Sequence, residues 1–179
     1  MEASPTPASA KPAADGATTG PFFADVRAGF ELPTLRKPPI TRLQLAKYAA
    51  ASGDFNPSHV DEDIARDEGK MGGVFAHGMI GMGFIGEMLT RWLWDRPLRR
   101  FLVRATTVVR PGDALECYGK VVRKWVEEED NLVEIAVGAR NQRGETTHAG
   151  TAVAALPTRP LTPSGRVKQP YLLQHRVIG

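Results

Sequence analysis

The residues with the clearest chemical potential are Asp54 and His59, five positions apart in the segment Ser52-Gly-Asp-Phe-Asn-Pro-Ser-His59. On one continuous helix, side chains at this spacing would point about 140° apart. Gly53 and Pro57 favour a shaped loop instead, on which the carboxylate and the imidazole can converge. Two such groups facing one pocket can hold a water, with one removing a proton and the other supplying one. Hydration of a double bond requires such a pair.

The same two residues also have a purely structural interpretation. An aspartate near glycine and proline commonly caps a turn or the next helix, and a histidine at a helix start is often simply a hydrogen-bonded polar residue. The isolated pair of Asp54 and His59 therefore does not decide between catalysis and capping. The complete string around them does.

Ser-Gly-Asp-Phe-Asn-Pro-Ser-His resembles the signature of the MaoC-like, (R)-specific enoyl-CoA hydratase family. A second segment, Ala76-His77-Gly78-Met79, is similar to the His-Gly-Met at the start of the central helix in that family. The resemblance covers residues 40–156. It implies an α+β hot-dog fold, in which an antiparallel sheet wraps around a long central helix.

The resemblance also implies an activity, the reversible hydration of trans-2-enoyl-CoA to (R)-3-hydroxyacyl-CoA. No metal or redox cofactor is expected, and coenzyme A is part of the substrate. The catalytic residues of the family correspond to Asp54 and His59, with their acid and base roles open. Gly78 would donate its amide to the thioester carbonyl, and the neighbouring His77 is also expected to contact the substrate. Asn56 is expected to fix the loop and is also a candidate to contact the substrate.

Ser58 departs from the family pattern, which commonly has an aliphatic residue before the histidine. Because no reacting group is lost, we expect an effect on packing or substrate preference. The same resemblance is compatible with two other functions. A hot-dog acyl-CoA thioesterase would cleave the thioester and release free CoA, and a subunit of a hetero-oligomeric dehydratase would complete the site of another chain. A structural or protein-binding module is the remaining alternative.

Three helices are expected around these residues. Thr41 and Gln44 have the form of a capping box, which predicts a helix over residues 41–52 that ends at Gly53. A short helix is expected over residues 61–68. Residues 77–94 carry apolar side chains on nearly every side, which is typical of a buried helix.

The second half of the chain predicts an antiparallel sheet. Four segments rich in Val, Thr, Ile and aromatic residues are separated by short turns, which favour an antiparallel meander. These segments are residues 101–110, 115–126, 132–140 and 146–156. A sheet and an apolar helix bury each other's apolar faces, as in the hot-dog fold. One exposed sheet edge would remain, so we expect a homodimer or higher oligomer, with a heterodimer as the alternative.

Length and composition favour one globular domain. The chain has 179 residues, of which 42% are hydrophobic. We expect a disordered leader over residues 1–20, the hot-dog domain over 21–156 and a C-terminal extension over 157–179. The single cysteine, Cys117, excludes an internal disulfide and indicates a reducing, cytoplasmic location.

The charge balance and the remaining motifs exclude other classes. With 23 basic and 20 acidic residues, the net charge of +3 does not indicate nucleic-acid binding. The apolar stretch over residues 72–89 contains His77, Glu87 and several glycines, so no membrane span is expected. The four histidines lack the paired spacing of metal ligands, and no metal site is predicted.

Overall fold

The computed structural model describes residues 20–67 and 72–159. The expected leader, apart from Gly20, and the C-terminal extension beyond residue 159 lie outside these ranges. In chain order the elements are η1 (Phe23–Asp25), β1 (Leu35–Lys37), α1 (Arg42–Ser52), η2 (Pro57–His59), α2 (Glu62–Asp67), α3 (Gly78–Leu93), β2 (Leu98–Ala105), β3 (Leu115–Glu127), β4 (Asp130–Asn141) and β5 (Thr146–Ala155).

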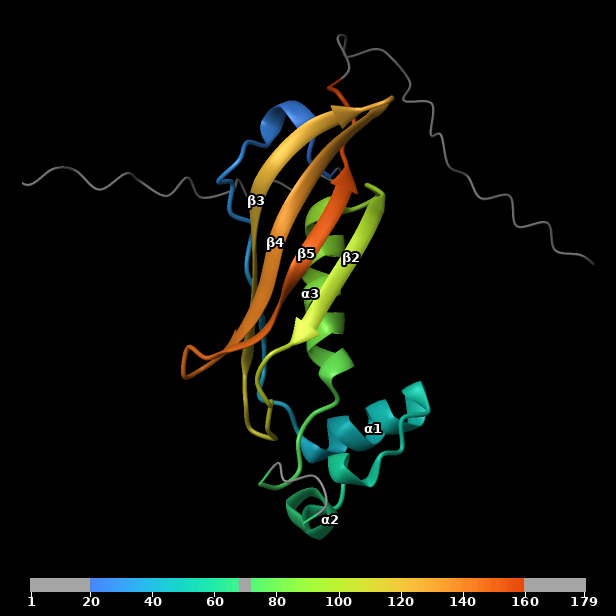
Figure 1. Ribbon diagram of the computed structural model, residues 1–179, viewed down its shortest axis with the longest axis vertical. Coiled ribbons are helices and arrows are strands. Elements are labelled where there is room, and N and C mark those ends of the chain that lie inside the picture. Colours follow the sequence, from blue (N-terminus) through green and yellow to red (C-terminus); the bar gives the residue numbers. More distant parts are fainter. Residues whose placement is uncertain (1–19, 68–71, 160–179) are drawn as a thin grey trace, which may run out of the picture.

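The five strands form one antiparallel sheet in the order β1-β3-β4-β5-β2. β3, β4 and β5 are the predicted meander, because each follows its neighbour through a short turn. β2 pairs with the far side of β5, and the short β1 pairs with the outer edge of β3. The long strands curve along α3 (Figure 1). This arrangement is the predicted α+β hot-dog fold.

The core lies between α3 and the concave face of the sheet. Ile85, Met88, Leu89 and Leu93 project from one side of α3 and are at most 2% exposed. They pack against buried strand residues such as Ile135. Burial of each large apolar side chain is worth about 1.5–3 kcal/mol, so this layer fixes the helix on the sheet.

The apolar residues on nearly every side of α3 predict a buried helix, but only the side that faces the sheet is buried in this chain. Met79 is 58% exposed, and Gly83, Thr90 and Arg91 are also exposed. The sheet covers only the opposite side of the helix. The Met79 side chain is therefore left uncovered near the start of α3. No helix in the described part of the chain is long and apolar enough to cross a membrane.

The first helix begins and ends as the sequence predicts. The Thr41 hydroxyl accepts a hydrogen bond from the Gln44 amide at 3.1 Å. Gly53 adopts φ 74° and donates its N–H to the Ala49 carbonyl, which ends α1. α1 and α2 lie beyond the start of α3 (Figure 1). Buried Leu45 of α1 and Ile80 of α3 belong to one apolar cluster, which fixes α1 relative to the start of the central helix.

One strand boundary differs clearly from its prediction. The strand expected over residues 101–110 is instead β2, Leu98–Ala105. The ladder stops there because the amides of Thr106 and Thr107 both approach the Thr147 carbonyl, at 2.8 and 3.4 Å. The Val109 carbonyl then accepts a hydrogen bond from the Ala76 amide. Residues 106–109 therefore run beside the segment that leads into α3.

Candidate active site

The loop after α1 is shaped by its own side chains. The Asn56 carboxamide oxygen accepts from the Ser58 amide at 3.0 Å, which caps the η2 turn that carries His59. Oδ1 of Asp54 lies 3.3 Å from the Asn56 amide, which donates to it. Asn56 therefore has the geometry of the loop-fixing residue that the sequence predicts. Its contact with substrate stays a prediction.

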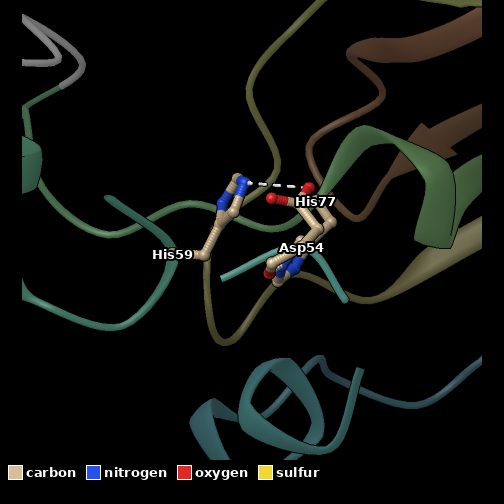
Figure 2. Close-up of side chains that lie close together, drawn as sticks. All are labelled: Asp54, His59 and His77. Carbon is tan, nitrogen blue, oxygen red and sulfur yellow. Dashed lines mark hydrogen bonds and ion pairs between the residues drawn. The ribbon is translucent and has the colours of Figure 1, made fainter. Parts of the chain in front are cut away.

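Asp54 and His59 lie together across this turn. Oδ2 of Asp54 is 4.0 Å from Nε2 of His59, and the imidazole faces the carboxylate (Figure 2). The His59 side chain is 7% exposed, whereas that of Asp54 is 52% exposed. The pair thus joins a buried imidazole to a carboxylate that solvent can reach. The distance exceeds that of a direct hydrogen bond.

The backbone fixes the orientation of His59. Its Nδ1 lies 2.8 Å from the Phe75 carbonyl oxygen, which can only accept, so Nδ1–H is the donor. In the neutral ring, Nε2 then carries the lone pair, on the side of Asp54. The Phe75 ring also meets the imidazole edge-on at 4.7 Å. His59 is therefore held in the tautomer that can accept a proton from a molecule beside Asp54.

His77 connects the loop over residues 53–59 to the central helix. It occupies the N-cap position of α3 and is 2% exposed. Its Nε2–H donates to the backbone carbonyl of Asp54 at 3.1 Å, and its ring lies 3.7 Å from that of His59. Nδ1 of His77 is buried and has no hydrogen-bond partner among the described residues. The His77 side chain thus contacts Asp54 and His59, while its expected contact with substrate stays a prediction.

A cavity of about 230 Å³ lies at the start of α3. Gly78 is the first residue of the helix, so its N–H has no carbonyl to bind within the helix. The helix dipole also favours negative charge there. The cavity lining is largely apolar and consists of Ile40, Phe75, Ala76, His77, Gly78, Gly81, Ala105, Thr106, Thr107, Val108, Val109, Leu115 and His148.

The five predicted site residues therefore divide into two groups. His77 and Gly78 line the cavity, whereas Asp54, Asn56 and His59 belong to the adjoining loop. The loop group meets the cavity through the contact between the His59 and His77 rings. The two groups come from separate segments, on either side of α2, that the fold brings together.

His148 is a cavity residue that the sequence did not single out. It lies on β5, is 2% exposed and lines the cavity beside Gly78. Burial lowers the pKa of its imidazole, and the hydrogen bond to the Gly78 carbonyl opposes this only in part. No motif marks this histidine, because its placement depends on the pairing of β5 with β4.

Asp54, His59 and His77 are also the residues most able to hold a metal ion, since one donor atom from each lies within 4.8 Å of the others. Two of the imidazole nitrogens already bind backbone carbonyls. The His59 and His77 rings are tilted by only 31°. A metal binds in the plane of each imidazole, so this stacking disfavours a shared ion. The predicted absence of a metal and of a cofactor stays a prediction.

A polar cluster supports the segment that leads to His77. The Arg110 guanidinium donates to the Gly73 carbonyl at 2.7 Å, while the Arg110 amide donates to the carboxylate of Asp113. Asp113 also accepts from Arg143 and Gln142. Burial by itself raises the pKa of Asp113, but these hydrogen bonds outweigh it and hold the pKa below its usual value. The cluster thus connects the turn before β3 to the backbone of the segment that leads into α3.

Comparison with known proteins identifies a family and several solved structures with a similar fold. The family model described as MaoC like domain matches residues 27–142, which is more than half of the chain. No curated protein matches the chain. The R-hydratase PhaJ1 from Pseudomonas aeruginosa, solved in the unliganded form, is 26% identical with a TM-score of 0.66. The match covers 76% of this chain and 86% of that one.

Two further structures share the fold at lower identity. The (R)-hydratase from A. caviae involved in PHA biosynthesis is 22% identical, with a TM-score of 0.64 and coverage of 74% of this chain and 98% of that chain. A chain of the ChsH1-ChsH2 complex from Mycobacterium tuberculosis is 23% identical, with a TM-score of 0.59 and the same two coverages. The second of these was solved as a complex of two different proteins.

Proposed function

Since the chain belongs to the MaoC-like dehydratase family, we propose that it catalyses the reversible hydration of trans-2-enoyl-CoA to (R)-3-hydroxyacyl-CoA. Family membership supports hydratase or dehydratase chemistry in general. The substrate, the stereochemistry and the residue roles are the proposal. The observation that carries it is the pairing of Asp54 with His59 at 4.0 Å beside the first turn of α3.

The catalytic pair would hold the reacting water. A contact longer than about 3.5 Å between two polar groups suits a bridging water, and one water can bind both Oδ2 of Asp54 and Nε2 of His59. Because Nδ1–H of His59 is bound to the Phe75 carbonyl, Nε2 is the atom that accepts the water proton. The Asp54 carboxylate stabilises the resulting imidazolium.

The bond changes balance within the substrate, the water and the pair. The water oxygen forms a bond to Cβ of the enoyl group, and its proton passes to Nε2 of His59. The electrons of the carbon–carbon double bond move onto the thioester oxygen to form an enolate. The proton on Nε2 of His59 then passes to Cα on the same face, which restores the neutral imidazole, while the enolate electrons re-form the thioester carbonyl.

Gly78 would stabilise the enolate oxygen. Its N–H stands at the first position of α3, and glycine places no side chain in the way of the carbonyl. One preorganised donor of this kind is worth about 3 kcal/mol in the transition state. The apolar cavity residues, among them Ile40, Val108 and Leu115, would then accommodate the acyl chain.

We propose a homodimer built on the exposed edge of the sheet. β2 is an edge strand, and its Leu102 side chain is 68% exposed. An unpaired apolar edge is a common site of strand pairing between copies. A heterodimer with a different chain is the alternative, and the ChsH1-ChsH2 complex is the structure that supports it. We further expect a cytoplasmic protein.

The experiment uses purified protein and crotonyl-CoA. Loss of absorbance of the enoyl thioester, with (R)-3-hydroxybutyryl-CoA as the product on chiral analysis, is the predicted result. A thiol reagent in a parallel assay detects free CoA, which only a thioesterase would release. Formation of the (S) product, or CoA release without hydration, would contradict the proposal. Size-exclusion chromatography with light scattering measures the oligomeric state in the same buffer.

A further inference from the structure

His148 is buried against the start of the central helix. Its Nε2 lies 2.9 Å from the carbonyl oxygen of Gly78, so Nε2–H donates to the first residue of α3. The imidazole occupies the space above Gly81, where an added Cβ would lie only 2.1 Å from Cε1 of the ring. The ring can therefore lie this close to the helix backbone only because Gly81 has no side chain.

An irregularity in the sheet directs this side chain. On β4, Ala139 pairs with His148 and Arg140 pairs with Thr146, so Thr147 is an extra residue in β5. As a result, Thr147 and His148 are buried in succession, which breaks the alternation of a regular strand. Such bulges re-aim side chains and are frequent beside active sites.

The bulge also supplies the hydrogen bonds that hold the imidazole. Because Nε2 carries the proton, Nδ1 of His148 can only accept. The Thr147 hydroxyl lies 3.1 Å from Nδ1 and 3.1 Å from the Ala139 carbonyl oxygen, and its single proton can be donated to either of them. The Thr147 carbonyl accepts from the Thr106 amide at the cavity wall. A continuous set of contacts thus runs from β4 through Thr147 and His148 to Gly78.

A buried imidazole is an expensive way to fill a core position, because an apolar side chain would need no partners. Here each ring nitrogen has a polar group within hydrogen-bond distance, and the partner of Nε2 is the carbonyl of Gly78, a residue that lines the cavity. We propose that His148 is a positioning residue, which holds the first turn of α3 so that the Gly78 amide is aimed at the substrate carbonyl. This inference rests on the proposed hydration reaction.

The first test compares three substitutions at the imidazole and its support. His148→Leu fills the space without a donor, and we expect kcat for crotonyl-CoA to fall at least tenfold with KM changed less than about threefold. His148→Gln can still donate to the Gly78 carbonyl and should keep most of kcat. Thr147→Val should lie between them. Unchanged kcat in His148→Leu, or a loss confined to KM, would overturn the proposal.

Two glycines of α3 provide a matched pair. Gly81→Ala would push the imidazole away from the helix, so we expect it to lower kcat as His148→Leu does. Gly83→Ala lies on the exposed side of the same helix, with nothing within 4 Å of the added Cβ, and should keep wild-type kcat. Equal effects of the two alanines would contradict a role for the His148 contact.

Hydrogen exchange tests the anchor without any substrate. In His148→Leu the amides of Ile80 and Met82 should exchange at least tenfold faster than in the wild type, while amides of β3 stay unchanged. Unaltered exchange at these amides would overturn the proposal. If the proposed function is wrong, the wild-type protein will be inactive towards crotonyl-CoA. Hydrogen exchange at Ile80 and Met82 would then still respond to His148→Leu.

Discussion

Nε2 of His59 and Oδ2 of Asp54 face each other at 4.0 Å, across a turn that Asn56 caps. Both groups are held by the short segment that leads into α3. The Phe75 carbonyl holds the far nitrogen of His59, and His77 donates to the backbone of Asp54. Substitutions in these supports should therefore affect activity without removing a reacting group.

Asn56→Ala tests the turn itself. Loss of the side-chain acceptor leaves the Ser58 amide without its cap, so we expect the free energy of unfolding to fall by about 1 kcal/mol. We also expect kcat to fall, because η2 sets the position of His59. Denaturant unfolding and steady-state kinetics measure the two effects. Asn56→Asp retains an acceptor and is the control. Unchanged stability and kcat in Asn56→Ala would show that the cap has no influence.

Metal removal should have no effect on the reaction. The proposed steps use only Asp54, His59 and the Gly78 amide, although Asp54, His59 and His77 offer donor atoms within 4.8 Å of one another. Treatment with EDTA followed by gel filtration should leave kcat unchanged, with metal content checked by mass spectrometry. A loss of activity that zinc or another divalent ion restores would contradict the metal-free reaction.

Stability should decline in acid in part through Asp113. Its folded-state pKa is depressed, so the stabilisation is fully present above the unfolded-state pKa of about 3.9 and is lost as pH falls through the folded value. Asp113→Asn should cost about 1–3 kcal/mol near neutral pH. Denaturant unfolding between pH 3 and pH 7 should show the two proteins converging at low pH. A difference that is constant with pH would contradict this account.

Cys117 should be unreactive in the folded protein. Burial raises the pKa of its thiol to about 12, so the thiolate needed for reaction is scarce at neutral pH. A thiol reagent should therefore give no signal with native protein and one equivalent after denaturation, because the chain has a single cysteine. Rapid labelling of the native protein would contradict this burial.

The parts of the site that could be predicted from sequence are those fixed locally. Thr41 and Gly53 mark the ends of α1 by capping chemistry, and the string from Asp54 to His59 carries the family resemblance. The strand prediction is wrong for residues 106–110, because the pairing of β2 with β5 ends where the Thr106 and Thr107 amides both approach the Thr147 carbonyl. The role of His148 depends on a bulge between two strands, and no local pattern reports such a pairing.

The central claim is that Asp54 and His59 act together on one water. The most direct measurement is the rate of crotonyl-CoA hydration by Asp54→Asn, which preserves the shape of the side chain. Asp63→Asn, at an exposed position in the first turn of α2, is the matched control. We predict that Asp54→Asn lowers kcat about 10²–10⁴-fold in a folded protein while Asp63→Asn stays near the wild-type rate. Near-normal turnover by Asp54→Asn would contradict the account.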